Sequence, residues 1–177
     1  LTGFFCVTKG IVKIYKTGID GKEQIIRFAK KGEIIAYRSL LSQELACTTA
    51  KVIDEAVLCH IPYQTLLFLI ESNWQFSHHM LQIVCAELRE ANDYITDIAQ
   101  KTVRERLAEV LLLLKENFDL DNQNTLQISL TREELANMVG TATESVIRLL
   151  SEFKQDKLIE LQGRKIKFLD IPSLRRV

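Results

Sequence analysis

The sequence predicts an α+β protein made of an antiparallel β-roll, one long helix and a small helical domain that ends in a β-hairpin. Three observations carry this prediction: glycine-punctuated apolar runs at the N-terminal end, an apolar repeat with helical spacing in the middle, and two short capped helices before a hairpin at the C-terminal end. We expect the roll over residues 1–72, the long helix over 73–101 and the helical domain over 102–177.

The N-terminal part is rich in strand-like runs separated by turns: FFCVTKG, IVKIYKTG, QIIRFAKKGEII and TAKVIDEAVLCHIP. The segment from Ile11 to Tyr15 alternates apolar and basic residues, and Asp20-Gly21 indicates a hairpin. These signals predict a jelly-roll-like antiparallel sheet. Residue 1 is not Met, and the first strand begins abruptly.

The central segment carries an apolar repeat in steps of three and four residues, which is the seam of a coiled coil. Charged residues lie elsewhere on the same helix, which favours two such helices pairing along their length as a homodimer. A helix that packs on its own chain is the alternative interpretation. The seam consists of Leu81, Val84, Leu88, Ala91, Ile95 and Ile98.

The segment LTREELANMVGTATESVIRLLSEF predicts two helices around a tight turn. Thr131 and Glu134 form a capping box that opens the first helix, which should run to about Val139. Gly140 supplies the positive φ that ends it, and a hydroxyl of Thr141 or Thr143 is expected to cap the second helix. The buried side is predicted to comprise Leu135, Met138, Val139, Val146, Leu149, Leu150 and Phe153.

Two alternating runs, Leu158 to Leu161 and Lys165 to Leu169, predict a hairpin wing after the second helix. From Arg148 to Val177 there are eight Lys or Arg against four Asp or Glu. This local excess of positive charge is suited to binding DNA phosphates. An ordinary solvated surface is the alternative. The candidate phosphate contacts are Thr131, Arg132, Thr141, Lys154, Arg164 and Lys165.

The outward side of the second helix predicts base reading in a DNA major groove. Glu144 can accept from a cytosine amino group, and Arg148 one turn later can donate two hydrogen bonds to guanine. Thr143, Ser145 and Ile147 share this side. A surface salt bridge between Glu144 and Arg148 is the alternative.

Composition alone would not indicate DNA, because the chain has 23 basic and 23 acidic residues. No run approaches the ~18 apolar residues of a membrane span, and the start lacks a secretory signal, so a cytoplasmic location without a membrane partner is expected. Four scattered cysteines give no metal-site spacing, and no catalytic or nucleotide-binding motif indicates an enzyme.

The order of parts resembles the Crp-Fnr family of bacterial transcription regulators over essentially the whole chain. The strongest matches are VTKGIVKIYKTGIDGKEQII, CHIPYQTL and TREELANMVGTATESVIRLLSEF. The resemblance implies a winged helix-turn-helix dimer that reads an inverted repeat in double-stranded DNA, with RNA polymerase as a partner. Family members normally carry further N-terminal strands, so the resemblance also implies that the roll in this sequence is truncated. The base-reading Glu and Arg of the family fall on Glu144 and Arg148, whereas Thr143 replaces the additional Arg of cyclic-AMP-type members.

The sensor region departs from the cyclic-nucleotide pattern, since the ribose-binding Glu and the phosphate-binding Arg are absent. Cyclic AMP is therefore not expected; another anion held by Arg38 is one interpretation, and a surface role for Arg38 is the other. Cys59 aligns with a cluster ligand of oxygen-sensing relatives, but one cysteine cannot hold a cluster, so no cofactor is identifiable. The candidate effector pocket consists of Tyr37, Arg38, Ser39, Thr48 and Thr49.

Two further functions remain open. The roll by itself suits a module that binds a cyclic nucleotide or another small anion, and a winged helix can bind protein in place of DNA. Titration with cyclic nucleotides distinguishes the first from a transcription regulator. DNA affinity that is insensitive to Arg148→Ala would indicate the second.

Overall fold

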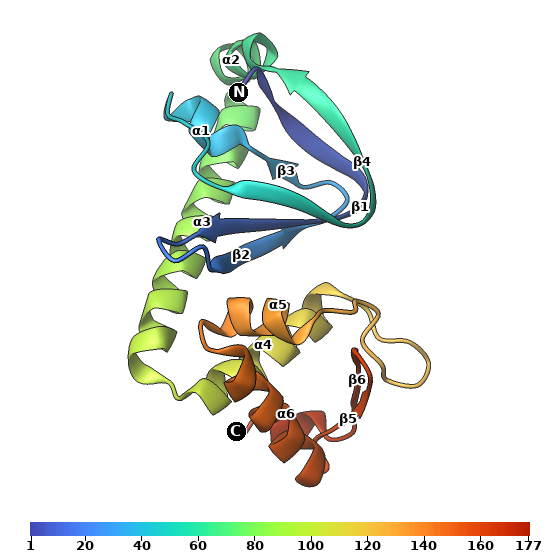
Figure 1. Cartoon of the computed structure of the whole chain (residues 1–177). Helices are drawn as coiled ribbons and strands as arrows, with labels where there is room; N and C mark the ends of the chain where they lie inside the picture. The colour runs from blue at the N-terminus through green and yellow to red at the C-terminus, as the bar shows by residue number, and fades with distance from the viewer. The chain divides into compact units, whose positions relative to one another are not determined.

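The computed structural model describes residues 1–177, apart from the side chain of Asp54, and the chain divides into two compact units, Leu1–Asn92 and Asp93–Val177 (Figure 1). The division falls inside helix α3, Trp74–Gln100, which contributes residues to both units. The sequence predicts three parts, a roll, a long helix and a helical domain, with boundaries at the two ends of this helix. That division stays a prediction.

The first unit is built on an antiparallel sheet around the long strand β1, Gly3–Thr17. Strand β1 pairs with β2 (Glu23–Ala29), with β3 (Ile34–Ile35) and, along most of its length, with β4 (Thr49–Pro62). Figure 1 shows β1 and β4 running side by side through a common bend. The predicted antiparallel roll is therefore confirmed.

The two strands expected on either side of Gly10 are one continuous strand, so that prediction was wrong. Gly10 has φ 82° and lies where the pairing of β1 with β4 shifts register, which identifies a β-bulge. A Cβ at this position would collide with the carbonyl oxygen of Glu55. The glycine therefore permits a close approach within a bent strand, whereas the sequence reads the same residue as a turn.

The predicted hairpin at Asp20-Gly21 joins β1 to β2. The amide of Gly18 donates to the carbonyl of Lys22 at 2.8 Å, and Gly21 has φ 75°. The basic residue Lys13 does not face solvent as its alternation with apolar neighbours indicates. Its side chain is 2% exposed and its ammonium lies 2.7 Å from the Glu23 carboxylate across the hairpin.

Two apolar clusters hold the first unit together. One lies within the sheet and comprises Val7, Val12, Ile14, Ala29 and Ile35. The other joins the sheet to α1 (Tyr37–Leu41), α2 (Tyr63–Ser72) and α3, and comprises Phe4, Tyr37, Leu40, Leu66 and Met80. Burial of these apolar side chains is the main source of stability in a small unit, because it removes apolar surface from water.

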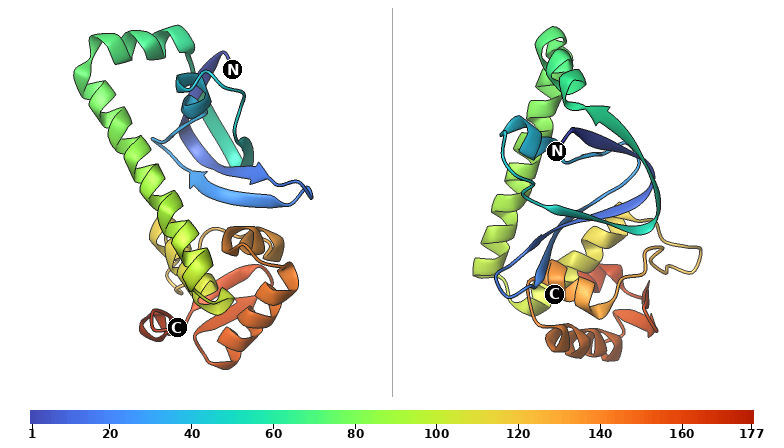
Figure 2. Two further views of the ribbon diagram at one scale, coloured as in Figure 1. Left: turned by 90° about the vertical axis from the view of Figure 1, so that its left-hand side faces the viewer. Right: turned by 45° about the horizontal axis from the view of Figure 1, so that its top comes forward.

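The second unit is a compact set of helices closed by a hairpin, as the two views in Figure 2 show. Every residue predicted for the buried side of the two short helices is buried. The wing strands begin or end one residue from their predicted bounds. The elements are α4 (Val103–Asn117), α5 (Arg132–Val139), α6 (Thr143–Gln155), β5 (Ile159–Gln162), β6 (Lys165–Phe168) and α7 (Ile171–Leu174).

Helix α3 carries two apolar stripes. Phe76, Met80 and Ile83 pack into the cluster of the first unit. The predicted seam lies on a different side of the helix and is exposed, with Leu81, Leu88 and Ile95 at 63%, 61% and 65% exposure. No helix among the described residues is long and apolar enough to cross a membrane.

Candidate nucleic-acid interface and sensor cavity

Helices α5 and α6 are set by the local signals that the sequence predicts. The Thr131 amide donates to the Glu134 carboxylate at 2.9 Å, and the Glu134 amide donates to the Thr131 hydroxyl at 3.1 Å, which completes the capping box. Gly140 has φ 71° and its amide donates to the Ala136 carbonyl at 2.9 Å. This turn ends α5 and redirects the chain into α6.

The predicted hydroxyl cap of α6 was wrong. The N-cap residue is Ala142, in extended backbone, and no side chain caps the helix. The Thr141 amide is drawn back to the Ala136 carbonyl at 3.1 Å, so Thr141 belongs to the closure of α5, and Thr143 already lies inside α6. The first amides of α6, at Thr143 and Glu144, therefore have no side-chain acceptor in the part of the chain that the structure describes.

Three of the five predicted base-reading residues lie on α6 away from its buried side, and the other two border that side. Glu144, Ile147 and Arg148 are exposed, whereas Thr143 and Ser145 are half-buried near the start of the helix. The opposite side of α6 is buried through Val146, Leu149, Leu150 and Phe153. A helix fixed by such a core presents its outward residues in a defined orientation, as groove reading requires.

Arg148 pairs with Glu152, one turn further along α6, and this differs from the Glu144–Arg148 salt bridge considered as an alternative. Glu152 also accepts from Arg104 of α4 at 2.9 Å, and Arg104 in turn binds Asp156 at 2.7 Å. Glu144 makes no ion pair with any residue whose side chain is described. The Arg148 side chain is 67% exposed, so its contact with Glu152 is open to exchange.

The predicted phosphate contacts fall into two groups. Lys154, Arg164 and Lys165 are exposed on the end of α6 and on the wing. Arg132 instead donates to the carbonyl of Gly163 at 2.8 Å, and burial lowers the pKa of its guanidinium from the ordinary value. Arg132 therefore supports the turn of the wing. The Thr131 hydroxyl is engaged in the capping box and Thr141 is half-buried at the turn between the helices.

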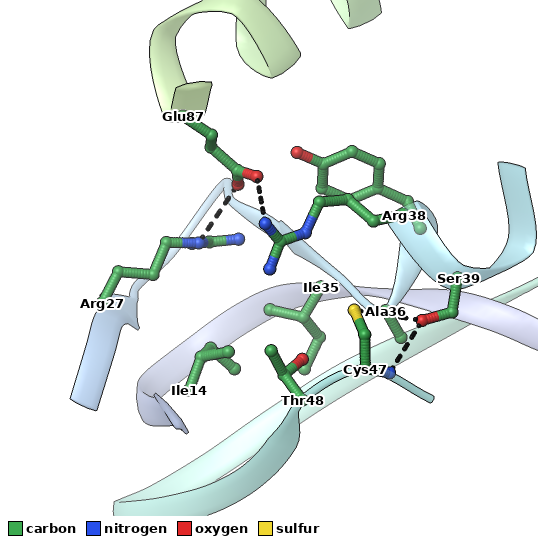
Figure 3. Close-up of a pocket in the computed structure, with 10 residues that line it drawn as sticks. Ile14, Arg27, Ile35, Ala36, Arg38, Ser39, Cys47, Thr48 and Glu87 are labelled. Atoms are coloured by element: carbon green, nitrogen blue, oxygen red, sulfur yellow. Dashed lines mark hydrogen bonds and ion pairs between the residues drawn. The ribbon is translucent and has the colours of Figure 1, made fainter. Parts of the chain in front are cut away.

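The predicted effector residues Tyr37, Arg38, Ser39 and Thr48 line one cavity in the first unit, whereas Thr49 lies outside it (Figure 3). The cavity measures about 20 Å³. That is room for about one water molecule, whereas ligand pockets typically measure about 300–1,000 Å³. In this conformation the cavity is closed to a nucleotide.

A carboxylate from α3 is part of the cavity lining. Figure 3 shows Glu87 reaching two arginines: its carboxylate lies 3.3 Å from the Arg27 guanidinium and 3.5 Å from that of Arg38. Arg27 is held further by Glu33 at 3.0 Å and by the Ile34 carbonyl at 2.7 Å. Burial and the neighbouring Glu87 carboxylate raise the pKa of Tyr37 above its ordinary value. Arg38 is thus an ion-pair partner of α3.

Sequence reasoning missed Arg27 and Glu87, although both have a readable signal. Arg27 alternates with Ile25 and Ala29 on the buried side of β2, where a charged residue needs a partner. Glu87 follows Phe76, Met80 and Ile83 in steps of four, three and four, so it continues the stripe that packs on the roll. A charged residue within an apolar pattern indicates that it has a buried partner, but the pattern does not say which residue that partner is.

A β-roll followed by a long helix and a winged helix-turn-helix is the architecture of a class of transcription regulators. Residues 1–73 match the model of the cyclic nucleotide-binding domain, and residues 105–177 match the Crp-like helix-turn-helix domain. The transcriptional activator protein FnrA of Stutzerimonas stutzeri is 27% identical over 168 residues, which cover 94% of this chain and 68% of FnrA. The chain belongs to the Crp-Fnr family and is a DNA-binding transcription regulator.

Solved structures agree with this assignment at the level of the fold. FixK2 of Bradyrhizobium japonicum has a TM-score of 0.81 at 22% identity, over 99% of this chain and 86% of FixK2. The Crp/Fnr-family regulator TTHA1359 of Thermus thermophilus has a TM-score of 0.83 at 22% identity, over 98% of this chain and 86% of that protein. The α+β fold class predicted from the sequence is confirmed.

Proposed function

We propose that this regulator acts as a homodimer that reads an inverted-repeat operator and is controlled by a signal received in the β-roll. The observation that carries the proposal is the uncovered seam of α3. Leu81, Leu88 and Ile95 are each more than half exposed. A stripe of this kind repeating along a helix is covered when a second identical helix packs against it, because knobs of one helix then enter holes of the other.

Dimerisation would also supply the geometry for DNA. Two copies of α6 related by a two-fold axis can enter successive major grooves about 34–36 Å apart. We assign base reading to the outward side of α6, with Arg148 donating to guanine and Glu144 accepting from cytosine. Lys154, Arg164 and Lys165 would contact phosphates, and Ile147 would touch a thymine methyl group. RNA polymerase is the expected protein partner at a promoter.

The roll is proposed to respond to a signal other than cyclic AMP. Neither the ribose nor the phosphate has its usual charged partner in the sequence, and Glu87 already occupies the two guanidinium groups beside the cavity. An anionic effector would have to displace the Glu87 carboxylate from Arg27 and Arg38. Since Glu87 belongs to α3, binding would change the contacts of the dimer helix and shift the population of DNA-competent dimers.

The first experiment is selection of preferred sites from a randomised duplex pool at fixed salt, followed by sequencing. We expect an enriched inverted repeat whose half-sites are one helical turn apart. The matched control is Leu88→Asp, which places a charge in the seam and should give a monomer by sedimentation that no longer enriches the repeat. A single half-site enriched equally by both proteins would contradict the dimer, and an unenriched pool would contradict sequence reading.

A second experiment tests the sensor. Cyclic AMP should not shift the thermal unfolding midpoint of the protein, because a ligand stabilises only the state that it binds. The comparison is Glu87→Gln, which releases Arg27 and Arg38 and should make the protein more responsive to phosphate or sulfate than the wild type. Stabilisation of the wild type by micromolar cyclic AMP would contradict this part of the proposal.

A further inference from the structure

Two cysteines lie directly opposite each other on neighbouring strands of the roll. Cys6 of β1 and Cys59 of β4 are partners in the antiparallel register. The next pair along, Phe5 and His60, has its rings in contact with centroids 5.1 Å apart, which supports the register independently. Side chains of directly opposed residues share a face, and successive pairs alternate faces. The two thiols therefore project from the same face, opposite to the Phe5 and His60 rings.

The backbone around the pair defines its geometry. The Val7 amide donates to Glu33 at 2.9 Å, and the Val7 carbonyl accepts from Gly32 at 2.8 Å, so the backbone of Val7 is directed away from β4. Because successive residues direct these groups to opposite sides, the backbone of Cys6 is directed toward Cys59. Such a hydrogen-bonded pair has its Cα atoms ~5.5 Å apart, within the ~4.4–6.8 Å spanned by disulfides.

Both thiols are free in the structure. Cys59 is exposed, so a reagent in solution can reach it, whereas Cys6 is half-buried and its thiol donates weakly to the Val7 carbonyl at 3.9 Å. An exposed thiol that reacts first and a sheltered neighbour that reacts second are the two parts of a thiol–disulfide exchange site.

We propose that Cys6 and Cys59 form a reversible disulfide that makes the roll responsive to redox conditions. The oxidant is a low-molecular-weight disulfide such as oxidised glutathione. The Cys59 thiolate attacks one of its sulfurs and releases one glutathione thiolate, and the Cys6 thiolate then attacks the mixed disulfide and releases the second. Two protein thiols become one disulfide, and one glutathione disulfide becomes two glutathione thiols.

The geometry favours a bond that is easily reduced. Opposed Cβ atoms on paired strands are typically ~4.5–5.5 Å apart, whereas a relaxed disulfide holds them ~3.5–4.5 Å apart. Forming the bond would draw β1 and β4 together near the bulge at Gly10, which would strain the disulfide. Strained disulfides have higher reduction potentials than relaxed ones, as labile regulatory bonds do. The disulfide would therefore form and be reduced within the range of cellular reduction potentials, and it would not be a permanent structural cross-link.

The test uses a variant in which Cys47 and Cys85 are both replaced by Ser, so that only the opposed pair remains. The full chain is equilibrated in glutathione buffers of graded ratio, quenched with acid, alkylated and weighed by mass spectrometry. We expect a species with the mass of a single chain less two hydrogen atoms, which takes up no alkyl group. Dithiothreitol should reverse the change completely. Peptide mapping of the wild type should find the same Cys6–Cys59 link.

Two single variants serve as matched controls. Cys6→Ser in the same background should stop at the glutathione adduct of Cys59, and Cys59→Ser should react slowly or remain reduced. Accumulation of the mixed disulfide in the variant that retains both cysteines would overturn the proposal, as would formation of the bond only between two chains. Because the readout is mass, it does not depend on dimerisation or on an operator.

Discussion

Each unit of the protein holds arginine against glutamate, but the two contacts differ in how much water surrounds them. Arg148 and Glu152 on α6 are 67% and 36% exposed, whereas Glu87 is 16% exposed between Arg27 and Arg38. An exposed pair contributes little and is easily exchanged for another partner. A largely buried carboxylate cannot be left without its cations except at a substantial cost. The comparison separates a surface that is ready for a ligand from a site that already contains its own anion.

The largest expected effect comes from breaking the buried contact. Glu87→Ala removes the carboxylate that Arg27 and Arg38 share. We expect a loss of about 1.5–3 kcal/mol in the free energy of unfolding, the range for hydrogen bonds to charged groups, because Arg27 keeps Glu33 and Arg38 is partly exposed. Denaturant unfolding of the variant measures this. Glu90→Ala, at an exposed position on α3, is the control and should change stability by less than about 0.5 kcal/mol. Equal effects of the two substitutions would show that the Glu87 contacts contribute no more to stability than an exposed side chain does.

The exposed contact should behave in the opposite way. Arg148→Ala should leave the unfolding free energy almost unchanged but cost about 1–3 kcal/mol of affinity for the selected operator and relax one base position. Fluorescence anisotropy on the operator and on a duplex changed at that base pair measures both effects. Gln155→Ala, also exposed on α6, is the control. Equal loss on every duplex would show that Arg148 contacts phosphate and does not read a base.

A carboxylate at a helix start gives a smaller effect that depends on pH. The Glu105 carboxylate accepts from the hydroxyl and the amide of Thr102, both at 2.6 Å, and the hydroxyl contact is the larger cause of its lowered pKa. The folded pKa lies below the unfolded one, so the stabilisation is present above the ordinary Glu value of about 4.3 and is lost as the pH falls through the folded value.

Glu105→Gln should therefore lower the thermal midpoint at neutral pH, and the difference from the wild type should shrink in acid. The measurement is a pair of melting curves for both proteins, one at neutral pH and one near pH 3. A difference that grows on acidification would contradict the capping role of the carboxylate.

The smallest expected effect concerns the exposed contact between Arg148 and Glu152. Glu152→Gln removes the negative charge that competes with DNA for Arg148, and an i,i+4 pair of this kind contributes about 0.3–0.5 kcal/mol. Operator affinity should therefore rise about twofold. Arg104 keeps Asp156 as a partner, so the link between α4 and α6 is preserved. A fall in affinity would mean that Glu152 positions Arg148 for DNA.

The second unit was predictable because its signals are local. Capping boxes, a glycine with positive φ and the spacing of apolar residues each act within a few residues, and they gave α5, the turn and the buried side of α6 correctly. The cap of α6 was mispredicted because the backbone of Thr141 is committed to the preceding helix. Whether Thr141 closes α5 or caps α6 depends on the backbone geometry of the turn, which cannot be read from the identity of the side chain.

The sensor cavity was harder to predict because its members come from distant parts of the chain. Tyr37, Arg38, Ser39 and Thr48 could be named from the resemblance, but the family pattern says nothing about the replacement of a ligand by Glu87. Arg27 and Glu87 are sixty residues apart and meet only once the roll has packed on α3. Long-range ion pairs of this kind require a fold before they can be assigned.

The bare start of α6 bears on how the regulator holds its target. Every helix leaves its first amides without internal partners, and here no hydroxyl or carboxylate from the described residues takes those at Thr143 and Glu144. Their dipoles favour an anion in that place. We expect a phosphate of the duplex to act as the missing cap, so that the nucleic acid completes a helix that the protein leaves open.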